Sequence, residues 1–233
     1  MYGSHSGYLL YYIFTLPALL LGLYAQWKVK SAYKKWSKVR NQRNITGAQA
    51  AEHLLVYSGM QNVGMQTTRG TLSDHYDPRS KQLFLSEGVA QSPSVAALGI
   101  VAHEVGHAQQ DASGYTPMKL RSAIVPAVQI GSWVGPIIFI AGLVLSMTPL
   151  TWVGLALFSC TVLFSLVTLP VELNASNRAV EMLTASGAIV GEEERQGVRS
   201  VLTAAALTYV AVAIQSILTL LYYFFLIFGR RRR

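Results

Sequence analysis

Charged residues are scarce in this sequence. Of its 233 residues only 13% are Asp, Glu, Lys or Arg, whereas 52% are hydrophobic and the mean hydropathy is +0.35. A soluble globular domain normally carries roughly twice that charged fraction. The composition therefore excludes an ordinary soluble domain and favours a membrane protein.

Cysteine is almost absent as well. Cys160 is the single cysteine, and it lies in an apolar run. One cysteine cannot form an internal disulfide or a cysteine-based zinc finger, so both features are excluded.

Four long stretches lack Asp, Glu, Lys and Arg altogether. They cover about residues 9–26, 122–147, 149–170 and 201–228. A helix needs roughly 20 apolar residues to cross a bilayer, so the sequence predicts a mainly α, polytopic membrane protein with about four transmembrane helices. The first stretch is interpreted as an uncleaved anchor, because no Lys or Arg precedes it as in a signal peptide.

The positive charge follows apolar segments. The net charge is +8; seven cations lie within residues 28–43, and Arg230 to Arg233 end the chain. This placement is typical of membrane topology, so we expect a lipid bilayer and no nucleic acid as partner. It predicts that residues 27–121 of an integral membrane protein are cytoplasmic, with the N-terminus outside.

The second and third spans form a predicted helical hairpin. Such a hairpin returns the chain to the side it left, so residues 171–200 rejoin residues 27–121. A simple crossing by the fourth span would place the Arg run outside, against the charge rule. That span is therefore expected to tilt, or to fold back near Gln215 and Ser216.

The first polar region has recognisable local signals. Thr46 and Gln49 form a capping-box pattern before a helix that ends at Gly59. Alternating residues predict short strands at 63–67 and 83–85, on either side of a turn-rich stretch. A further helix is predicted from Ser92 as N-cap to about residue 111.

That last helix carries the sequence HEVGH at residues 103–107. His103 and His107 lie four residues apart, which places two imidazoles on one helix face where both can bind one zinc ion. Glu104 lies about 100° round the helix and can reach a water molecule on the metal. Gly106 costs the helix roughly 1 kcal/mol relative to Ala, which indicates that something approaches closely there.

A catalytic zinc needs a third protein ligand and one open position. His53 and His75 are possible ligands. Glu172 is the better candidate, because it directly follows the third span and the predicted hairpin would return it beside the helix of His103.

Several segments together resemble a known family. HEVGHAQQ, the upstream LSDHYDPRSKQLFLS, the later ELNASNRA and the ALTYVA at 206–211 are similar to the neutral zinc metallopeptidases of bacterial membranes. These resemble the gluzincin peptidases, which include the prenyl-protein (CAAX) and heat-shock membrane proteases. The resemblance covers most of residues 44–215. It implies a small α+β zincin-like catalytic domain that binds Zn²⁺ through His103, His107 and Glu172, with Glu104 as the catalytic base.

One position departs from the gluzincin pattern. Four residues after the metal-binding Glu, those peptidases have Asp, whereas this chain has Ser176. A hydroxyl can hydrogen-bond a ligand imidazole but supplies no charge, so zinc is expected to be held more weakly or to be supported by another group. Asn177 is a possible substitute.

These residues predict a membrane-bound zinc endopeptidase that acts on peptides or membrane-proximal proteins. The organisation expected for it is an anchor (1–27), a cytoplasmic zincin-like region (28–121), a transmembrane hairpin (122–170), a third-ligand helix region (171–200) and a last transmembrane helix with a basic tail (201–233). The oligomeric state is left open.

Two further roles in this enzyme have several candidates. The developing oxyanion needs a donor, for which the candidates are His75, Tyr76, Arg178 and Tyr209. Residues 82–86 offer either a strand edge for an extended substrate or an interior strand.

Three alternatives compete with this interpretation. An intramembrane protease would need the HEVGH helix to span lipid, and that helix is too polar. A zinc transporter would need ionisable residues inside several spans, and these spans have none. A non-catalytic membrane scaffold with a structural zinc site would have no need for Glu104.

Overall fold

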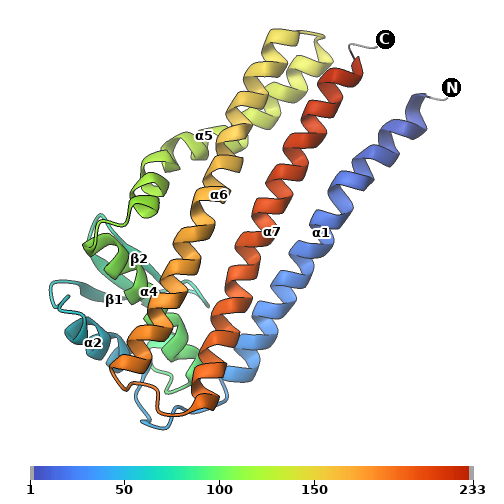
Figure 1. The fold of residues 1–233 in the computed structure, drawn as a ribbon. Helices are drawn as coiled ribbons and strands as arrows, with labels where there is room; N and C mark the ends of the chain where they lie inside the picture. The colour runs from blue at the N-terminus through green and yellow to red at the C-terminus, as the bar shows by residue number, and fades with distance from the viewer. Residues whose placement is uncertain (1–2, 231–233) are drawn as a thin grey trace. The chain divides into compact units, whose positions relative to one another are not determined.

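The computed structural model describes residues 3–230 and is mainly helical, with one small sheet (Figure 1). The elements are, in chain order, α1 (Gly3–Trp36), α2 (Gly47–Tyr57), β1 (Gly64–Thr68), β2 (His75–Asp77), β3 (Gln82–Ser86), α3 (Glu87–Ala90), α4 (Val95–Ala112), α5 (Thr116–Val144), α6 (Thr148–Ala185) and α7 (Glu192–Arg230). The predicted fold class, mainly α, is confirmed at this level.

Three of the described helices are long and apolar enough to cross a membrane. They cover Thr116–Val144, Thr148–Ala185 and Glu192–Gly229. The third and fourth predicted spans lie inside the last two, and the first includes the second predicted span up to Val144, three residues short of its predicted end. The count of about four spans is not confirmed, because α1, which contains the first predicted span, is not among them. That span remains a prediction.

The chain forms two compact units. We call them the apolar unit, made of Met1–Ala25, Lys119–Pro170 and Thr208–Arg233, and the polar unit, made of Gln26–Met118 and Val171–Leu207.

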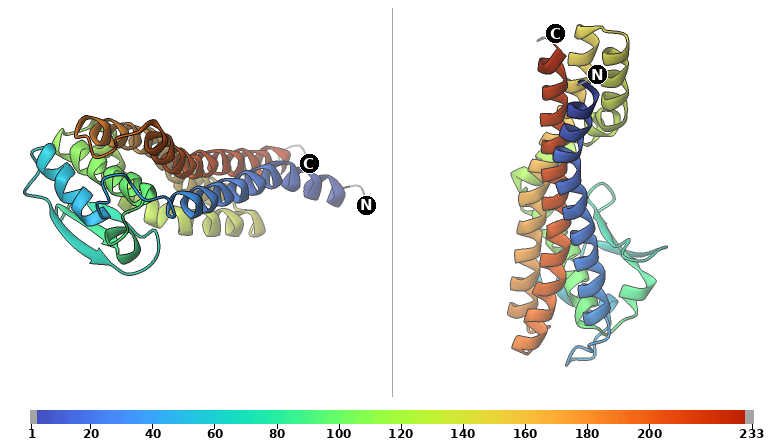
Figure 2. Two further views of the ribbon diagram at one scale, coloured as in Figure 1. Left: turned by 90° about the horizontal axis from the view of Figure 1, so that it is seen from below. Right: turned by 90° about the vertical axis from the view of Figure 1, so that its right-hand side faces the viewer.

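Helices of the apolar unit run alongside one another in both views of Figure 2. The rings of Tyr11 on α1 and Tyr222 on α7 lie 5.6 Å apart, and Phe139 of α5 is fully buried. A Cβ atom on Gly154 of α6 would stand 2.3 Å from the backbone nitrogen of Phe139, so only glycine permits this approach of α5 and α6. Close backbone packing at small residues thus joins α5 to α6.

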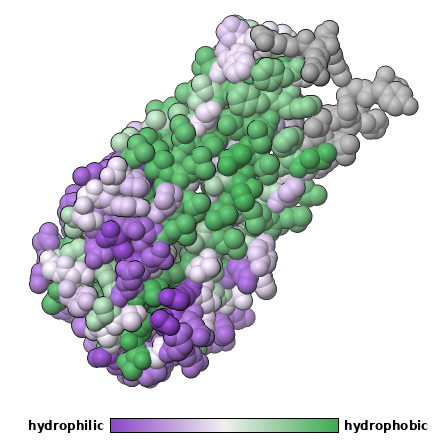
Figure 3. Space-filling model, in the orientation of Figure 1, coloured by the Kyte–Doolittle hydropathy of each residue, from purple (hydrophilic) through white to green (hydrophobic). Residues whose placement is uncertain are grey.

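The outer surface of the apolar unit is rich in apolar side chains, which appear as the green area of Figure 3. Trp133 is 78% exposed, and Ile137 and Val144 are also largely exposed. A water-soluble protein rarely exposes so much contiguous apolar area, so this surface is suited to lipid.

Helix α4 is the centre of the polar unit. Leu98, Val101 and Val105 follow one another at helical spacing and are fully buried. They belong to a core that also contains Leu54 of α2 and Leu83 of β3. His103 and His107 therefore stand on a helix that packs into the core of the unit.

The start of α2 agrees with the sequence, whereas the start of α4 does not. Thr46 caps α2 with the complete capping box: its hydroxyl accepts from the backbone N–H of Gln49, and the Gln49 side chain accepts from the backbone N–H of Thr46. The N-cap of α4 is Ser94, two residues later than predicted. Residues 92–94 are extended instead, since the carbonyl of Pro93 accepts from the backbone N–H of Asn41 at 2.9 Å.

The sheet has the strand order β1-β3-β2. β1 pairs with β3 in parallel and β2 pairs with β3 antiparallel, so β3 is bonded on both sides. The possibility that residues 82–86 offer a free edge to a substrate is wrong, and the interior-strand alternative is right. β2 lies in the stretch that the sequence predicted only as turns.

Helices α6 and α7 are longer than the spans predicted within them. α6 continues without interruption past Pro170 to Ala185, so Glu172 lies inside it rather than opening a new helix. α7 continues past Gln215 and Ser216, so the fold-back proposed there is wrong. The Arg231 to Arg233 part of the basic tail lies outside the described residues.

Candidate metal centre

His103 and His107 project from one face of α4. Their ring centroids are 4.7 Å apart with the planes nearly perpendicular, and both side chains are largely buried. The spacing of four residues places the two rings one turn apart, as the sequence predicts.

The side chain of Glu172 reaches the same place from α6. Its Oε2 lies 3.1 Å from Nε2 of His103 and 3.6 Å from Nε2 of His107. One ligand atom from each of the three residues lies within 4.8 Å of the others. A tetrahedral zinc ion with bonds of 2.0–2.2 Å holds its ligand atoms about 3.3 Å apart, so the three side chains fit this ion.

Gly106 explains how α6 comes so near. A Cβ atom at this position would stand 2.7 Å from the carbonyl oxygen of Ala175, which is closer than a side chain tolerates. The glycine therefore lets the backbones of α4 and α6 touch between the two histidines and Glu172. The sequence-based expectation of a close approach at Gly106 matches this contact.

Glu104 is 8% exposed and lies close enough to His103, His107 and Glu172 to interact with their charges. Its Oε2 accepts a hydrogen bond from the backbone N–H of Tyr76 on β2 at 3.0 Å. Burial raises the pKa of Glu104 above the ordinary carboxyl value, although the nearby His103 and His107 oppose this shift. A carboxyl group with a raised pKa is suited to accept and return a proton near neutral pH.

The electrostatic environment of His107 is acidic. Burial lowers its pKa, but the hydrogen bond to Glu172 and the charges of Glu104 and Glu172 outweigh burial and raise the pKa overall. The acidic neighbours thus favour a positive charge at this place. A bound metal ion would supply such a charge.

Each histidine also has a partner on its second nitrogen. Oγ of Ser176 lies 3.2 Å from Nδ1 of His103. Oε1 of Gln110 lies 3.0 Å from Nδ1 of His107. Asn177, predicted as a substitute for the missing carboxylate, is exposed and has no described contact with either imidazole.

Sequence reasoning missed Gln110 and Asn174. Gln110 is fully buried and donates to Oδ1 of Asn174 at 3.0 Å. A signal was present, because Gln110 follows His107 by three residues and so shares its helix face. Asn174 could not be found in this way, since its contact depends on how α6 packs against α4.

Three candidate oxyanion donors have other contacts in the structure. The hydroxyl of Tyr76 donates to Asp111 at 2.7 Å, and burial with this contact raises its pKa. The ring of His75 stacks on Phe84 at 4.7 Å. Nε of Arg178 donates to Asn174 at 2.8 Å.

Two candidates remain, Tyr209 as an oxyanion donor and His53 as a third ligand. Tyr209 belongs to the part of α7 in the apolar unit, and its role remains a prediction. His53, an alternative third ligand, is exposed, and its Nε2 lies 3.2 Å from the carbonyl oxygen of Ser186. Within the described chain, the group of metal-ligating side chains that converges is the one containing Glu172.

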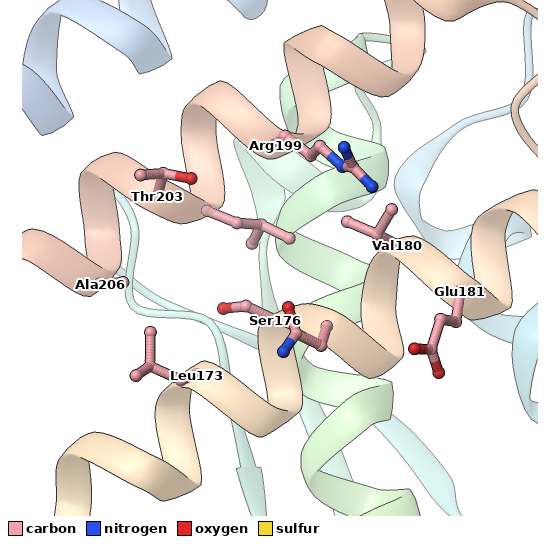
Figure 4. A pocket seen from close by; sticks show the side chains of 9 residues that line it. Leu173, Ser176, Val180, Glu181, Arg199, Thr203 and Ala206 are labelled. Atoms are coloured by element: carbon pink, nitrogen blue, oxygen red, sulfur yellow. The ribbon is translucent and has the colours of Figure 1, made fainter.

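A groove of about 270 Å³ lies between α6 and α7 in the polar unit. Figure 4 shows the side chains of both helices directed toward this space, with Leu173 and Ala206 at one end and Glu181 and Arg199 at the other. Ser176 lines this groove and also forms the hydrogen bond with His103, so the groove lies next to the candidate metal centre.

Comparison with known proteins gives a consistent result. The model of a family described as "Putative neutral zinc metallopeptidase" matches residues 11–228. A relative from Bacillus subtilis (strain 168), named "Putative membrane protease YugP", is 44% identical over 213 residues, which are 91% of this chain and 94% of the relative. No solved structure matches the chain.

Proposed function

We propose, from the premise that this chain belongs to the family described as "Putative neutral zinc metallopeptidase", that it is a membrane-bound zinc endopeptidase. The observation that carries the proposal is the convergence of His103, His107 and Glu172 beside a buried Glu104. Two neutral imidazoles and one carboxylate are a ligand set of catalytic zinc sites, which keep a fourth position open.

The mechanism follows from the residues around that position. A bound zinc ion would polarise the peptide carbonyl and lower the pKa of a water molecule toward about 7. Glu104 takes the proton from the attacking water and later delivers it to the leaving amine. The N–H of Tyr76 holds the carboxyl of Glu104 in one orientation between these two steps.

The groove between α6 and α7 is the proposed site for part of the substrate. From Leu173 to Glu181 the helix rises by about 12 Å, which matches three to four residues of extended peptide. Its wall combines apolar side chains with Asn177 and Thr203, which offer hydrogen bonds to a peptide backbone. These properties suit a peptide segment with at least one apolar side chain.

The site is proposed to face the cytoplasm, close to the lipid headgroups. Cations gather at residues 28–43 of the polar unit, in agreement with the positive-inside rule. Helix α4 is not among the described helices that are apolar enough to span a bilayer, which supports a surface site over one inside the membrane. Membrane and membrane-proximal proteins are therefore the proposed substrates.

The first test compares the full-length, detergent-solubilised protein with Glu104→Gln, using an unfolded protein as substrate. We expect Glu104→Gln to keep one zinc ion and to lose at least about 100-fold in activity, because the proton acceptor is gone. Equal proteolysis by the two proteins would refute the mechanism.

The second test measures the metal directly. His103→Ala and Glu172→Ala should each reduce zinc to well below one ion per chain, whereas His53→Ala should leave it unchanged. Full zinc content in Glu172→Ala would exclude this residue as the third ligand.

A further inference from the structure

Gln110 is a fully buried polar side chain of the polar unit. Its carboxamide has three contacts: Oε1 with Nδ1 of His107 at 3.0 Å, and Nε2 with the carbonyl oxygen of Val171 at 2.8 Å and with Oδ1 of Asn174 at 3.0 Å. It thus joins α4 to α6 directly behind one of the proposed metal ligands.

The contact with Val171 sets the orientation of this amide. A backbone carbonyl only accepts hydrogen bonds, so the group facing Val171 must be the NH₂ of Gln110. The carbonyl oxygen of the same amide must then face His107. Nδ1 of His107 is consequently the donor in this hydrogen bond and carries a proton.

A second contact sets the same orientation independently. The guanidinium of Arg178 only donates, and its Nε lies 2.8 Å from Asn174, so the oxygen of Asn174 must face it. That oxygen also accepts from Nε2 of Gln110. Arg178 is itself held by Gln109, whose Oε1 accepts from Nη1 at 3.1 Å.

We propose that Gln110 is a positioning residue that commits the metal-binding lone pair of His107 to Nε2. With Nδ1 as the donor to Gln110, the lone pair that can bind a metal lies on Nε2, the nitrogen that faces Glu172. The proposal rests on the proposed function, because it takes His107 to be a zinc ligand. Arg178 and Asn174 support the same orientation of the Gln110 amide without contacting His107 themselves.

His103 differs in this respect. Its Nδ1 faces the hydroxyl of Ser176, which can donate or accept and rotates freely between the two. The side chain of His103 is also 15% exposed, against 10% for His107. The two imidazoles therefore have different partners. The carboxamide of Gln110 can only accept from His107, whereas the hydroxyl of Ser176 can accept from His103 or donate to it.

Proton NMR of the cobalt(II)-loaded, full-length protein tests this difference. The N–H protons of coordinated imidazoles are shifted far from other resonances by the paramagnetic ion and exchange with solvent at separate rates. We expect one slowly exchanging proton, from His107, and one faster proton, from His103. Gln110→Leu should abolish the slow proton, and Ser176→Ala should alter only the fast one.

Zinc affinity gives the second readout. Gln110→Leu should weaken zinc binding about 10- to 100-fold, the usual effect of losing such a partner. Asn174→Ala should weaken it less, because Val171 still orients Gln110. Gln91→Leu is the control, because Gln91 is an exposed glutamine of the polar unit whose side chain contacts Glu87 and no imidazole, and it should change affinity less than threefold.

Two results would overturn the proposal: equal exchange rates for both protons in the unsubstituted protein, or survival of the slow proton in Gln110→Leu. The first measurement needs no variant, so a failure of Gln110→Leu to fold leaves the proposal testable. A protein with this proton pattern but without proteolysis would refute the proposed function alone.

Discussion

Glu104 is the residue in which function and stability oppose each other most directly. A carboxylate buried beside a second carboxylate loses hydration, and only the N–H of Tyr76 and the two imidazoles compensate for it. Burial raises the pKa of Glu104, so the folded chain keeps this proton to higher pH than the unfolded chain does. In the metal-free protein the free energy of unfolding therefore falls as pH rises from about 4.5 through the raised pKa.

We predict that Glu104→Gln stabilises the metal-free protein in a pH-dependent way. Glutamine has no proton to lose, so its advantage over the unsubstituted chain should be absent near pH 4 and should grow as the pH rises through the raised pKa of Glu104. Thermal unfolding of chelator-treated protein across this range measures the effect. Glu52→Gln, at an exposed site of α2, is the control and should show no such trend; an equal gain at pH 4 and pH 8 would contradict the explanation.

At the scale of elements, the contact between α4 and α6 decides whether a metal centre exists. Two ligands stand on one helix and the third on the other, and the two backbones meet at Gly106 and Ala175. Another glycine of α4, Gly99, faces Val198 of α7 at ordinary contact distance, since a Cβ atom there would lie 3.5 Å away. Helix α4 thus has one glycine with no room for a Cβ atom, Gly106, and one with room for it, Gly99.

We predict opposite outcomes for alanine at these two glycines. Gly106→Ala should destabilise the protein by about 1–3 kcal/mol and weaken zinc binding, because the added methyl group pushes α6 away from α4. Gly99→Ala should be neutral or stabilising by up to about 1 kcal/mol, because alanine favours the helix. Denaturant unfolding and zinc titration check both; an unchanged zinc affinity in Gly106→Ala would contradict the assigned contact.

At the scale of the whole molecule, segments far apart in sequence share one polar unit. Residues 26–118 and 171–207 meet in it, although helices α5 and α6 intervene along the chain. Lys38 and Glu193 are exposed on these two segments, whereas Thr148 is exposed where α6 begins in the apolar unit. If α5 and α6 cross the bilayer, the first two positions must face one side and Thr148 the other.

We predict this sidedness for single cysteines placed in a Cys160→Ser background. In intact cells a membrane-impermeant maleimide should label Thr148→Cys but neither Lys38→Cys nor Glu193→Cys. Both of the latter should react after the cells are lysed. Labelling of Lys38→Cys and Glu193→Cys from opposite sides would contradict the hairpin, and labelling of both from outside would reverse only the proposed orientation.

Local signals in the sequence were sufficient for several features. The capping box at Thr46, the apolar runs of α5 to α7 and the helical spacing of His103 and His107 depend on neighbours within a few residues, so no tertiary structure was needed to predict them. Glu172 was predicted as a ligand on two grounds: the assumed hairpin that returns the chain, and the resemblance to the zinc metallopeptidases.

Packing between distant segments decided the remaining features. Helix α4 begins after Ser94 rather than after Ser92, because the carbonyl of Pro93 accepts a hydrogen bond from the backbone N–H of Asn41 instead of one within the helix. β3 became an interior strand because β1 and β2 are held on both of its edges. Likewise, the orientation of Gln110 follows from a carbonyl and a guanidinium on α6, and hydrogen-bond directions across two helices leave no pattern along one chain.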